Sequence, residues 1–321
     1  MTSLLTNTAA QTALQTLTET NRSLSITQSR IATGYRVATA ADNAAYWSIA
    51  TAMRSDNAAL STVEDALGLG AATIDVAYTA VDQAIDVMTE FKKKLVAARQ
   101  PGMDRVKIQA EIDELQSQLR GIGSAAVFSG ENWLQVDSSL PGYNALKSVV
   151  SSFSRSGSTV TVDTITIDTA DMVLFDSGAA AAEQGVLDGE RFLATGALDP
   201  LGVGDAYSIA GTADGIDISL LTDSSADLTI LGQYIQAADM AMGELTDAAT
   251  SLGSVKSRID LQKNFVAALR EAIDRGIGQL VDADMNEEST RLQALQVQAQ
   301  LGIQALAIAN TSSQNILALF K

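Results

Sequence analysis

The sequence predicts a mainly α-helical chain with an inserted β-rich domain. Long antiparallel coiled-coil helices from both termini make the chain hairpin-shaped. Two observations predict this fold class. Apolar and small residues near both ends recur at alternating steps of three and four, the spacing of helices that bury a stripe against a partner. Residues 126–230 lack that spacing and are rich in Ser, Thr, Gly, Asp and β-branched residues.

The first helix is expected from about Thr6 to Ile31, with Gly34 supplying a left-handed C-cap. Its seam is predicted to hold Leu14, Leu17, Asn21, Leu24, Gln28 and Ile31. A stripe of this width needs a second helix to cover it, and the other end of the chain is the first candidate.

A second, much longer helix is expected from Asp42 or Asn43 to Ala98, where Gln100-Pro101-Gly102 ends it. A helix of ~50 residues spans ~75 Å. Its seam keeps heptad phase over twelve positions: Leu60, Val63, Leu67, Gly70, Ile74, Ala77, Val81, Ala84, Met88, Phe91, Leu95 and Ala98. A third helix, about 104–122, follows a short loop and is therefore expected to run antiparallel to the second. Its apolar face is predicted to hold Ile108, Ile112, Leu115, Leu119 and Ile122.

The middle segment, 137–230, is predicted to be a separate, strand-containing insert. Residues 159–167 and 215–220 alternate at period two, while Asp188-Gly189 and Asp214-Gly215 are turn signals. Residues 137–232 hold 14 acidic and three basic residues, which accounts for −11 of the total charge of −17. We interpret this charge as a solvated acidic surface.

The C-terminal half returns to helix at about 231–281, breaks at Asp282-Ala283-Asp284, and continues from Asn286 to Leu319. The seam of the first of these helices is predicted to hold Val255, Ile259, Gln262, Val266, Leu269, Ile273, Gly276 and Leu280. The last helix is predicted to hold Leu292, Leu295, Ala299, Gly302, Leu306, Ala309, Ser313, Ile316 and Phe320. Small and polar seam residues let backbones approach closely but add little stability. The terminal helices are therefore expected to be marginal alone and ordered in an assembly.

The composition excludes several kinds of chemistry. The chain has no cysteine and no histidine, which removes disulfides, Cys/His zinc sites and the Ser-His-Asp triad. The acidic charge disfavours nucleic acid and anionic membranes. No apolar run approaches the roughly 20 residues of a membrane span. The N-terminus has neither the basic region nor the compact apolar region of a cleavable signal peptide.

Three groups of charged residues have two interpretations each. Asp214, Asp217 and Asp223 could form a calcium cluster, but they lack the twelve-residue loop pattern, so turn formation is favoured. The pairs Asp282/Asp284 and Glu287/Glu288 are better explained by the dipole at a helix N-terminus than by acid–base chemistry. Lys92-Lys93-Lys94 is either a solvated face or a partner for acidic groups of a neighbouring subunit.

Three segments together resemble bacterial flagellin, most closely the alphaproteobacterial type. They are Gln28–Val37 with Ala40–Ala45, Gln109–Ile112 with Phe128-Ser129-Gly130, and Leu252–Lys321 with its tail Gln300–Phe320. Tyr46–Ala50 is similar to the alphaproteobacterial variant of its region. The resemblance covers about 1–136 and 233–321, and the middle matches no family pattern, as expected of a variable outer domain.

The resemblance implies a structural protein, not an enzyme and without a cofactor, that polymerises into the extracellular flagellar filament used for motility. It implies an inner-core helix at 1–41 and another at 285–321, a helical shell from 42–136 and 231–284, and a surface-exposed insert at 137–230. Implied partners are copies of itself, sister flagellins, and the flagellar export chaperone, cap and junction proteins. Export would follow the flagellar type III route without signal-peptide cleavage.

The resemblance also places Phe91, Leu95 and Glu111 where some flagellins contact the innate immune receptor Toll-like receptor 5. Leu95 and Glu111 match the family's motif, whereas Phe91 replaces an arginine, so weak or absent receptor activation is predicted. The alternative is that Phe91 and Leu95 are seam residues only.

Two other functions stay open at this point: a hook–filament junction protein, and a flagellin whose insert acts as an adhesin. An insert with a histidine-based protease motif is excluded because the chain has no histidine.

Overall fold

The computed structural model describes residues 7–157, 159–178, 185–189, 191–192, 206–210 and 215–318. Its α-helices in those residues are α1 (Thr8–Thr33), α2 (Ala44–Ala98), α3 (Arg105–Ala125), α4 (Ser225–Val281) and α5 (Met285–Ala318). Each predicted helix is present, and most ends lie within three residues of the prediction; α4 begins six residues earlier. The chain forms two compact units, Met1–Ala59 with Leu269–Lys321 (unit 1) and Leu60–Ala268 (unit 2).

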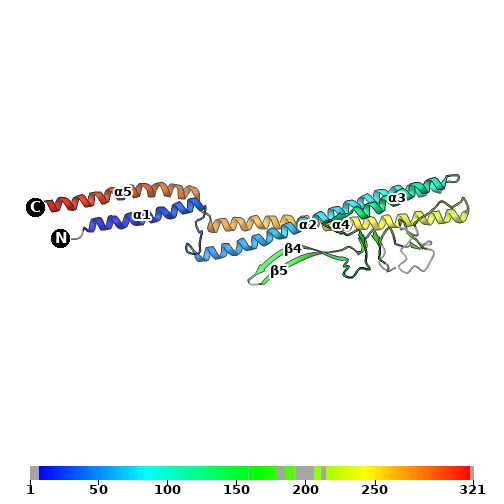
Figure 1. The fold of residues 1–321 in the computed structure, drawn as a ribbon, viewed down its shortest axis with the longest axis horizontal. Helices are drawn as coiled ribbons and strands as arrows, with labels where there is room; N and C mark the ends of the chain where they lie inside the picture. The colour runs from blue at the N-terminus through cyan, green and yellow to red at the C-terminus, as the bar shows by residue number, and fades with distance from the viewer. Residues whose placement is uncertain are drawn as a thin grey trace. The chain divides into compact units, whose positions relative to one another are not determined.

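Unit 1 contains the paired terminal helices α1 and α5, which run antiparallel side by side (Figure 1). The side chain of Asn7 caps α1 by accepting a hydrogen bond from the Ala10 N–H at 3.0 Å. Gly34 ends α1 with a φ of 76°, and its N–H donates to the Arg30 carbonyl oxygen at 2.8 Å. The left-handed C-cap predicted at Gly34 is confirmed.

Backbone hydrogen bonds and a small apolar cluster join residues 34–37 to the end of α4 and the residues after it. The Ala283 N–H donates to the Gly34 carbonyl at 2.9 Å, and the Arg36 N–H donates to the Val281 carbonyl at 2.7 Å. The guanidinium of Arg36 also donates to the carbonyls of Gln279 and Leu280, two of the carbonyls that the end of α4 leaves without helical partners. The adjoining buried cluster contains Val37, Ala50, Ile277 and Val281, with Trp47, Met53, Ile273 and Leu280 packed against it.

Unit 2 is built on α3 and the unit 2 portions of α2 and α4. All twelve seam positions predicted between Leu60 and Ala98 are buried. Lys94 on α2 pairs with Glu111 on α3, and Lys92 and Asp75 on α2 pair with Asp239 and Lys256 on α4. At the start of α3, Arg105 Nε donates to the Ala98 carbonyl at the end of α2 at 3.0 Å. Both α3 and α4 therefore run antiparallel to α2, and the orientation predicted for the third helix is confirmed.

The described parts of residues 127–207 contain strands that pair in two-stranded sheets. The longest pair is the antiparallel hairpin of β4 (Leu146–Ser156) and β5 (Thr159–Asp168), in register from Leu146↔Asp168 to Ser156↔Thr159. β3 (Gln135–Val136) pairs in parallel with β6 (Phe175–Asp176). The remaining pairs are β1 (Val127–Phe128) with β2 (Glu131–Asn132), and β7 (Arg191–Phe192) with β8 (Ala206–Tyr207). A 3₁₀ turn covers Ala170–Met172. The predicted strand at 159–167 and the turn at Asp188-Gly189 are present.

The strand suggested by the alternation at 215–220 was wrong. Gly215 makes one isolated bridge with Ser208, and no strand follows it. Ile216 and Ile218 are buried, and side chains of α3 bond their backbone: Gln109 accepts from the Ile218 N–H at 2.8 Å and donates to the Ile216 carbonyl at 3.2 Å. The alternation therefore reflects packing on α3, where the Gln109 side chain bonds the backbone that a partner strand would otherwise bond.

Candidate assembly surface

The surface that can join copies of this chain lies on the terminal helix pair of unit 1. On α5, partly or fully buried positions recur at heptad spacing and include every predicted seam residue from Leu292 to Ala309. On α1, the corresponding positions are Ala10, Ala13, Leu17, Thr20, Leu24, Thr27 and Ile31. The α1 seam thus keeps the predicted Leu17, Leu24 and Ile31, but uses Ala13, Thr20 and Thr27 in place of Leu14, Asn21 and Gln28.

Contacts at three levels hold α1 and α5 in register. At the outer end, the Asn7 side chain donates to the Ala309 carbonyl at 3.0 Å. In the middle, a Cβ on Gly302 would lie 3.1 Å from Leu17 Cδ1, so the missing side chain lets the two helices approach closely. At the inner end, Arg30 Nη1 lies 3.0 Å from Glu288 Oε1.

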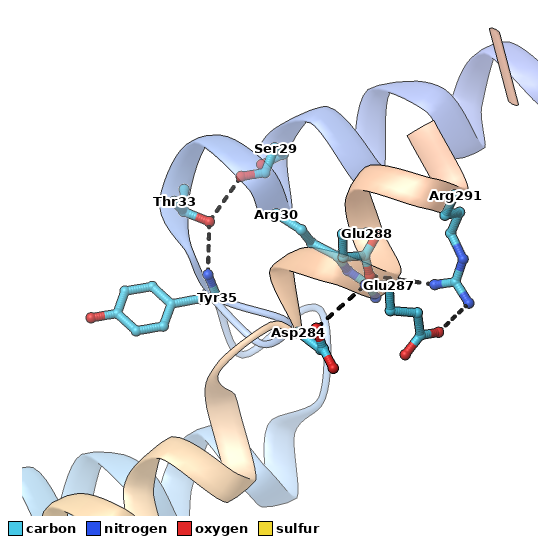
Figure 2. A network of polar contacts seen from close by, with 8 residues as sticks. All are labelled: Ser29, Arg30, Thr33, Tyr35, Asp284, Glu287, Glu288 and Arg291. Atoms are coloured by element: carbon cyan, nitrogen blue, oxygen red, sulfur yellow. Dashed lines mark hydrogen bonds and ion pairs between the residues drawn. The ribbon is translucent and has the colours of Figure 1, made fainter. Parts of the chain in front are cut away.

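The contact between Arg30 and Glu288 belongs to a polar network at the N-terminus of α5 (Figure 2). The side chain of Glu288 is only 5% exposed, and its Oε1 accepts from Arg30 and, at 3.3 Å, from Arg291. Arg291 also reaches Glu287 at 3.0 Å. Asp284 caps α5, because its side chain accepts from the Asn286 N–H at 2.8 Å. Asp284 therefore caps α5, and Glu287 and Glu288 lie in its first turn, as the helix-dipole interpretation expects. Their ion pairs with Arg30 and Arg291 were not predicted.

A second heptad line on α5 is uncovered. Val297, Leu301 and Ile308 are 54%, 57% and 68% exposed, and with Ala294 and Gln304 they repeat at steps of three and four. The line starts two residues after the seam that contacts α1, so it lies about 200° around the helix, on the opposite face. The sequence analysis missed this line, although the same spacing is readable in the printed sequence. Exposed apolar stripes of this kind mark interaction surfaces.

The remaining predicted seam residues are partly accounted for. Leu14 on α1 is 54% exposed and lies outside the row of partly buried positions on α1. Ile316 lies within α5, but its side chain and all of Phe320 lie outside the described residues. Whether any of these residues contacts another subunit stays a prediction.

Phe91 and Leu95, predicted for a degraded receptor region, are both fully buried in unit 2. Glu111 is exposed and pairs with Lys94, which raises the pKa of that lysine through a side-chain hydrogen bond. Phe91 and Leu95 therefore lie where the alternative interpretation as seam residues places them. The weak or absent receptor activation stays a prediction.

The other charged groups from the sequence also have structural partners. Lys92, Lys93 and Lys94 each pair with a carboxylate of the same chain, so the run is not a free basic surface. Asp217 accepts from the Ser219 N–H, and Asp223 from Arg105 and from the Gly102 N–H, while Asp214 lies outside the described residues. Within the described ranges, no group of three or more acidic side chains could hold a metal ion. In the same ranges, no helix has the length and apolarity needed to cross a bilayer.

A two-sided terminal helix pair, covered on one seam and bare on the other, defines a subunit of a helical assembly. Residues 4–138 match the family model of the bacterial flagellin N-terminal helical region, and residues 235–320 match that of the C-terminal helical region. The chain belongs to the bacterial flagellin family and is a structural subunit of the flagellar filament. Neither family model covers 139–234, the segment that contains β4 to β8.

Named relatives agree with this assignment over the full length of the chain. Flagellin C of Rhizobium meliloti (strain 1021) is 53% identical over 331 residues, with all of both chains covered. Flagellin A of Rhizobium meliloti is 43% identical over 400 residues, and a flagellin of Brucella melitensis biotype 1 is 42% identical over 322, again with full coverage of both chains. These relatives support the alphaproteobacterial type and a filament subunit over a junction protein.

Proposed function

We propose that this chain polymerises by placing the uncovered line of α5 (Ala294, Val297, Leu301, Gln304 and Ile308) against helices of neighbouring copies. The observation that carries the proposal is the exposure of three large apolar side chains at heptad spacing on a helix whose other seam is already occupied. Leu14 of α1 is a second exposed apolar contact for the same neighbours.

We further propose that 1–41 and 285–321 form the inner core of the filament, with 42–136 and 231–284 as its helical shell. The insert, 137–230, would face solvent. Its concentration of acidic residues supports this placement, because a strongly charged surface is best hydrated. We propose a structural and not a catalytic role for the whole chain.

The proposed partners are copies of this chain, sister flagellins, the flagellar export chaperone, and the cap and junction proteins. Export through the flagellar route without a cleaved signal peptide is part of the same proposal. A chain without cysteine needs no oxidation step after it leaves the cell unfolded. We also propose weak or absent activation of Toll-like receptor 5, because Phe91 cannot supply the charged, multiply bonding anchor of an arginine. Full potency of the monomer in a reporter-cell assay would contradict this last point.

The assembly proposal is tested with the triple variant V297S/L301S/I308S in seeded elongation of purified monomer, followed by light scattering. The three residues are 54%, 57% and 68% exposed, so burying each of them in a contact is worth about 1 kcal/mol. The three losses together raise the critical concentration by about a hundredfold. Elongation at the wild-type critical concentration would refute the role given to this line.

The matched control is Q293S/Q300S, which shortens two exposed side chains of the same helix outside the apolar line. This control is expected to elongate like the wild type. The far-ultraviolet circular dichroism of both variants establishes that α5 still forms before assembly is compared.

A further inference from the structure

In the inserted segment, the carboxylate of Asp188 fastens a turn to a strand, and the carboxylate of Asp176 lies near it. The turn at 185–189 is bonded along its backbone to the approach of β6: the Val186 N–H donates to the Val173 carbonyl at 2.8 Å, and the Leu187 N–H to the Leu174 carbonyl at 2.9 Å. Asp188 completes the attachment, because its Oδ2 accepts from the Asp176 N–H at 2.7 Å.

The two carboxylates differ in how well their oxygens are satisfied. Asp176 Oδ1 accepts from the Ser138 N–H at 2.9 Å and from the Gly178 N–H at 2.8 Å. Asp188 Oδ1 is buried and has no hydrogen-bond partner. It faces the space beside Gly185, where the Leu174 carbonyl also points and where an added Cβ would lie 2.6 Å from Asp188 Oδ1. A buried anionic oxygen without a donor is costly, and a proton on it removes that cost.

Among the side chains that the structure describes, no lysine or arginine forms an ion pair with Asp176 or Asp188. Asp176 also lines a cavity of about 670 Å³ whose other titratable groups are carboxylates and one phenol. These come from β5 and its end (Asp168), the 3₁₀ turn (Asp171), α4 (Glu244 and Asp247) and the loop before β4 (Tyr143). The elements packed around the two carboxylates thus present negative charge and no described lysine or arginine at this cavity.

We propose that Asp176 and Asp188 form an acid-closed clasp. A proton taken up on Asp188 Oδ1 fastens the 185–189 turn to β6, and loss of that proton loosens the attachment at neutral pH.

The direction of this effect follows from the protonation equilibrium of Asp188. Burial, and secondarily the charge of Asp176, raise the pKa of Asp188 from 3.8 to about 6, against the lowering effect of its backbone hydrogen bonds. Between these two values the closed form binds a proton that the opened form does not. Closing is therefore favoured as the pH falls from about 7 toward about 4 and is disfavoured as the pH rises through about 6. From about pH 7.5 to about pH 5, the ratio of closed to open clasp rises roughly tenfold.

The clasp is a property of the folded insert and does not require polymerisation. Its consequence at a filament surface does rest on the proposed function, because only a solvent-facing insert would respond to external acid. The hydrogen-exchange test on the monomer can therefore contradict the clasp while the elongation test supports the assembly proposal. The opposite pair of results is equally possible.

Hydrogen exchange of the full-length monomer tests the clasp directly. The protection factors of the Asp176, Val186 and Leu187 amides, each corrected for the intrinsic rate, are compared at about pH 5 and about pH 7.5. The wild type is expected to show roughly tenfold more protection at the lower pH. Amides of the β4–β5 hairpin serve as the internal reference. Protection of the clasp amides that changes less than twofold relative to this reference would overturn the proposal.

Two variants assign the effect to Asp188. Asp188→Asn retains an oxygen for the Asp176 N–H but has no titrating proton, so protection is expected to become independent of pH. Asp171→Asn removes an exposed carboxylate of the same cavity and is expected to retain the tenfold dependence. Retained dependence in D188N, or its loss in D171N, would contradict the assignment. If D188N fails to fold, the pH dependence of amide protection in the wild type and in D171N still tests the proposal.

Discussion

The ion pair of Arg30 and Glu288 shows what single residues contribute to the terminal helix pair. Most of the α1–α5 seam consists of small or aliphatic side chains, whereas Glu288 places a charge where only 5% of its side chain is exposed. A buried charge is tolerated when paired, and it then adds specificity more than net stability. The sequence analysis saw Glu288 only as a helix-dipole residue, because its partner lies 258 positions away.

Removing the arginine should therefore cost more than removing both charges. Arg30→Met leaves Glu288 with Arg291 alone, and we expect the terminal pair to lose about 2–3 kcal/mol. The double variant R30M/E288L should recover most of this loss, because packed apolar groups replace the pair. Urea titration of helix content, with limited proteolysis of α1 and α5, measures both. Equal stabilities of the single and double variants would contradict this interpretation.

At the scale of elements, the helices were predictable and their contacting faces only partly so. The α2 seam was fully predictable because large apolar residues at most of its positions hold one phase from Leu60 to Ala98. On α1, apolar and polar residues occupy several faces, and Leu14 follows the heptad as well as Ala13 does. The small side chains of Ala13, Thr20 and Thr27 face α5 and permit close approach, whereas Leu14 stays exposed. A pattern of hydrophobicity alone does not express that steric requirement.

The inserted segment was predictable only in part, for a different physical reason. The hairpin strand at 159–168 alternates and pairs locally, so its sequence carries the information. Ile216 and Ile218 alternate equally well, but their backbone is bonded by Gln109 of α3. Such a long-range side-chain partner leaves no mark in a local pattern.

The docking of the hairpin on α2 gives a prediction at this scale. A Cβ on Gly70 would lie 2.5 and 2.8 Å from the two methyl groups of Val149, so Gly70→Ala should strain the base of β4 and cost about 1–3 kcal/mol. Gly68, two residues earlier on the same helix, has no atom within 4 Å of an added Cβ. Gly68→Ala should therefore stabilise α2 by about 0.5–1 kcal/mol.

Urea unfolding of both variants, with hydrogen exchange of the Val149 region, checks these opposite signs. The double variant G70A/V149A creates the missing room and should recover part of the loss. If G68A and G70A change the free energy of unfolding in the same direction, the close packing against Val149 does not explain why residue 70 is a glycine.

At the scale of the whole molecule, the two units differ in how much of their apolar surface a single chain covers. Unit 2 buries large apolar side chains completely, among them Leu67, Ile74, Phe91 and Leu95. The α1–α5 pair of unit 1 has mostly half-buried seams and an uncovered line on α5. Stability that depends on neighbouring copies changes with protomer concentration. Unit 2 is therefore expected to be the independently stable part, and the terminal pair the part completed by assembly.

Deleting either terminal helix tests this division of roles. Removal of residues 1–30 takes away most of α1 and so uncovers the α5 seam that packs against it. Removal of residues 290–321 takes away both the seam and the exposed line of α5. Each deletion should abolish seeded elongation. The core of unit 2 contains none of the deleted residues, so its unfolding midpoint should change little. Trp133, which is buried in unit 2, and Trp47, which packs in unit 1, are the two tryptophans of the chain and report on the units separately. A truncated chain that still elongates would refute the role of the terminal helices. Loss of the Trp133 transition would instead show that unit 2 needs the terminal pair in order to fold.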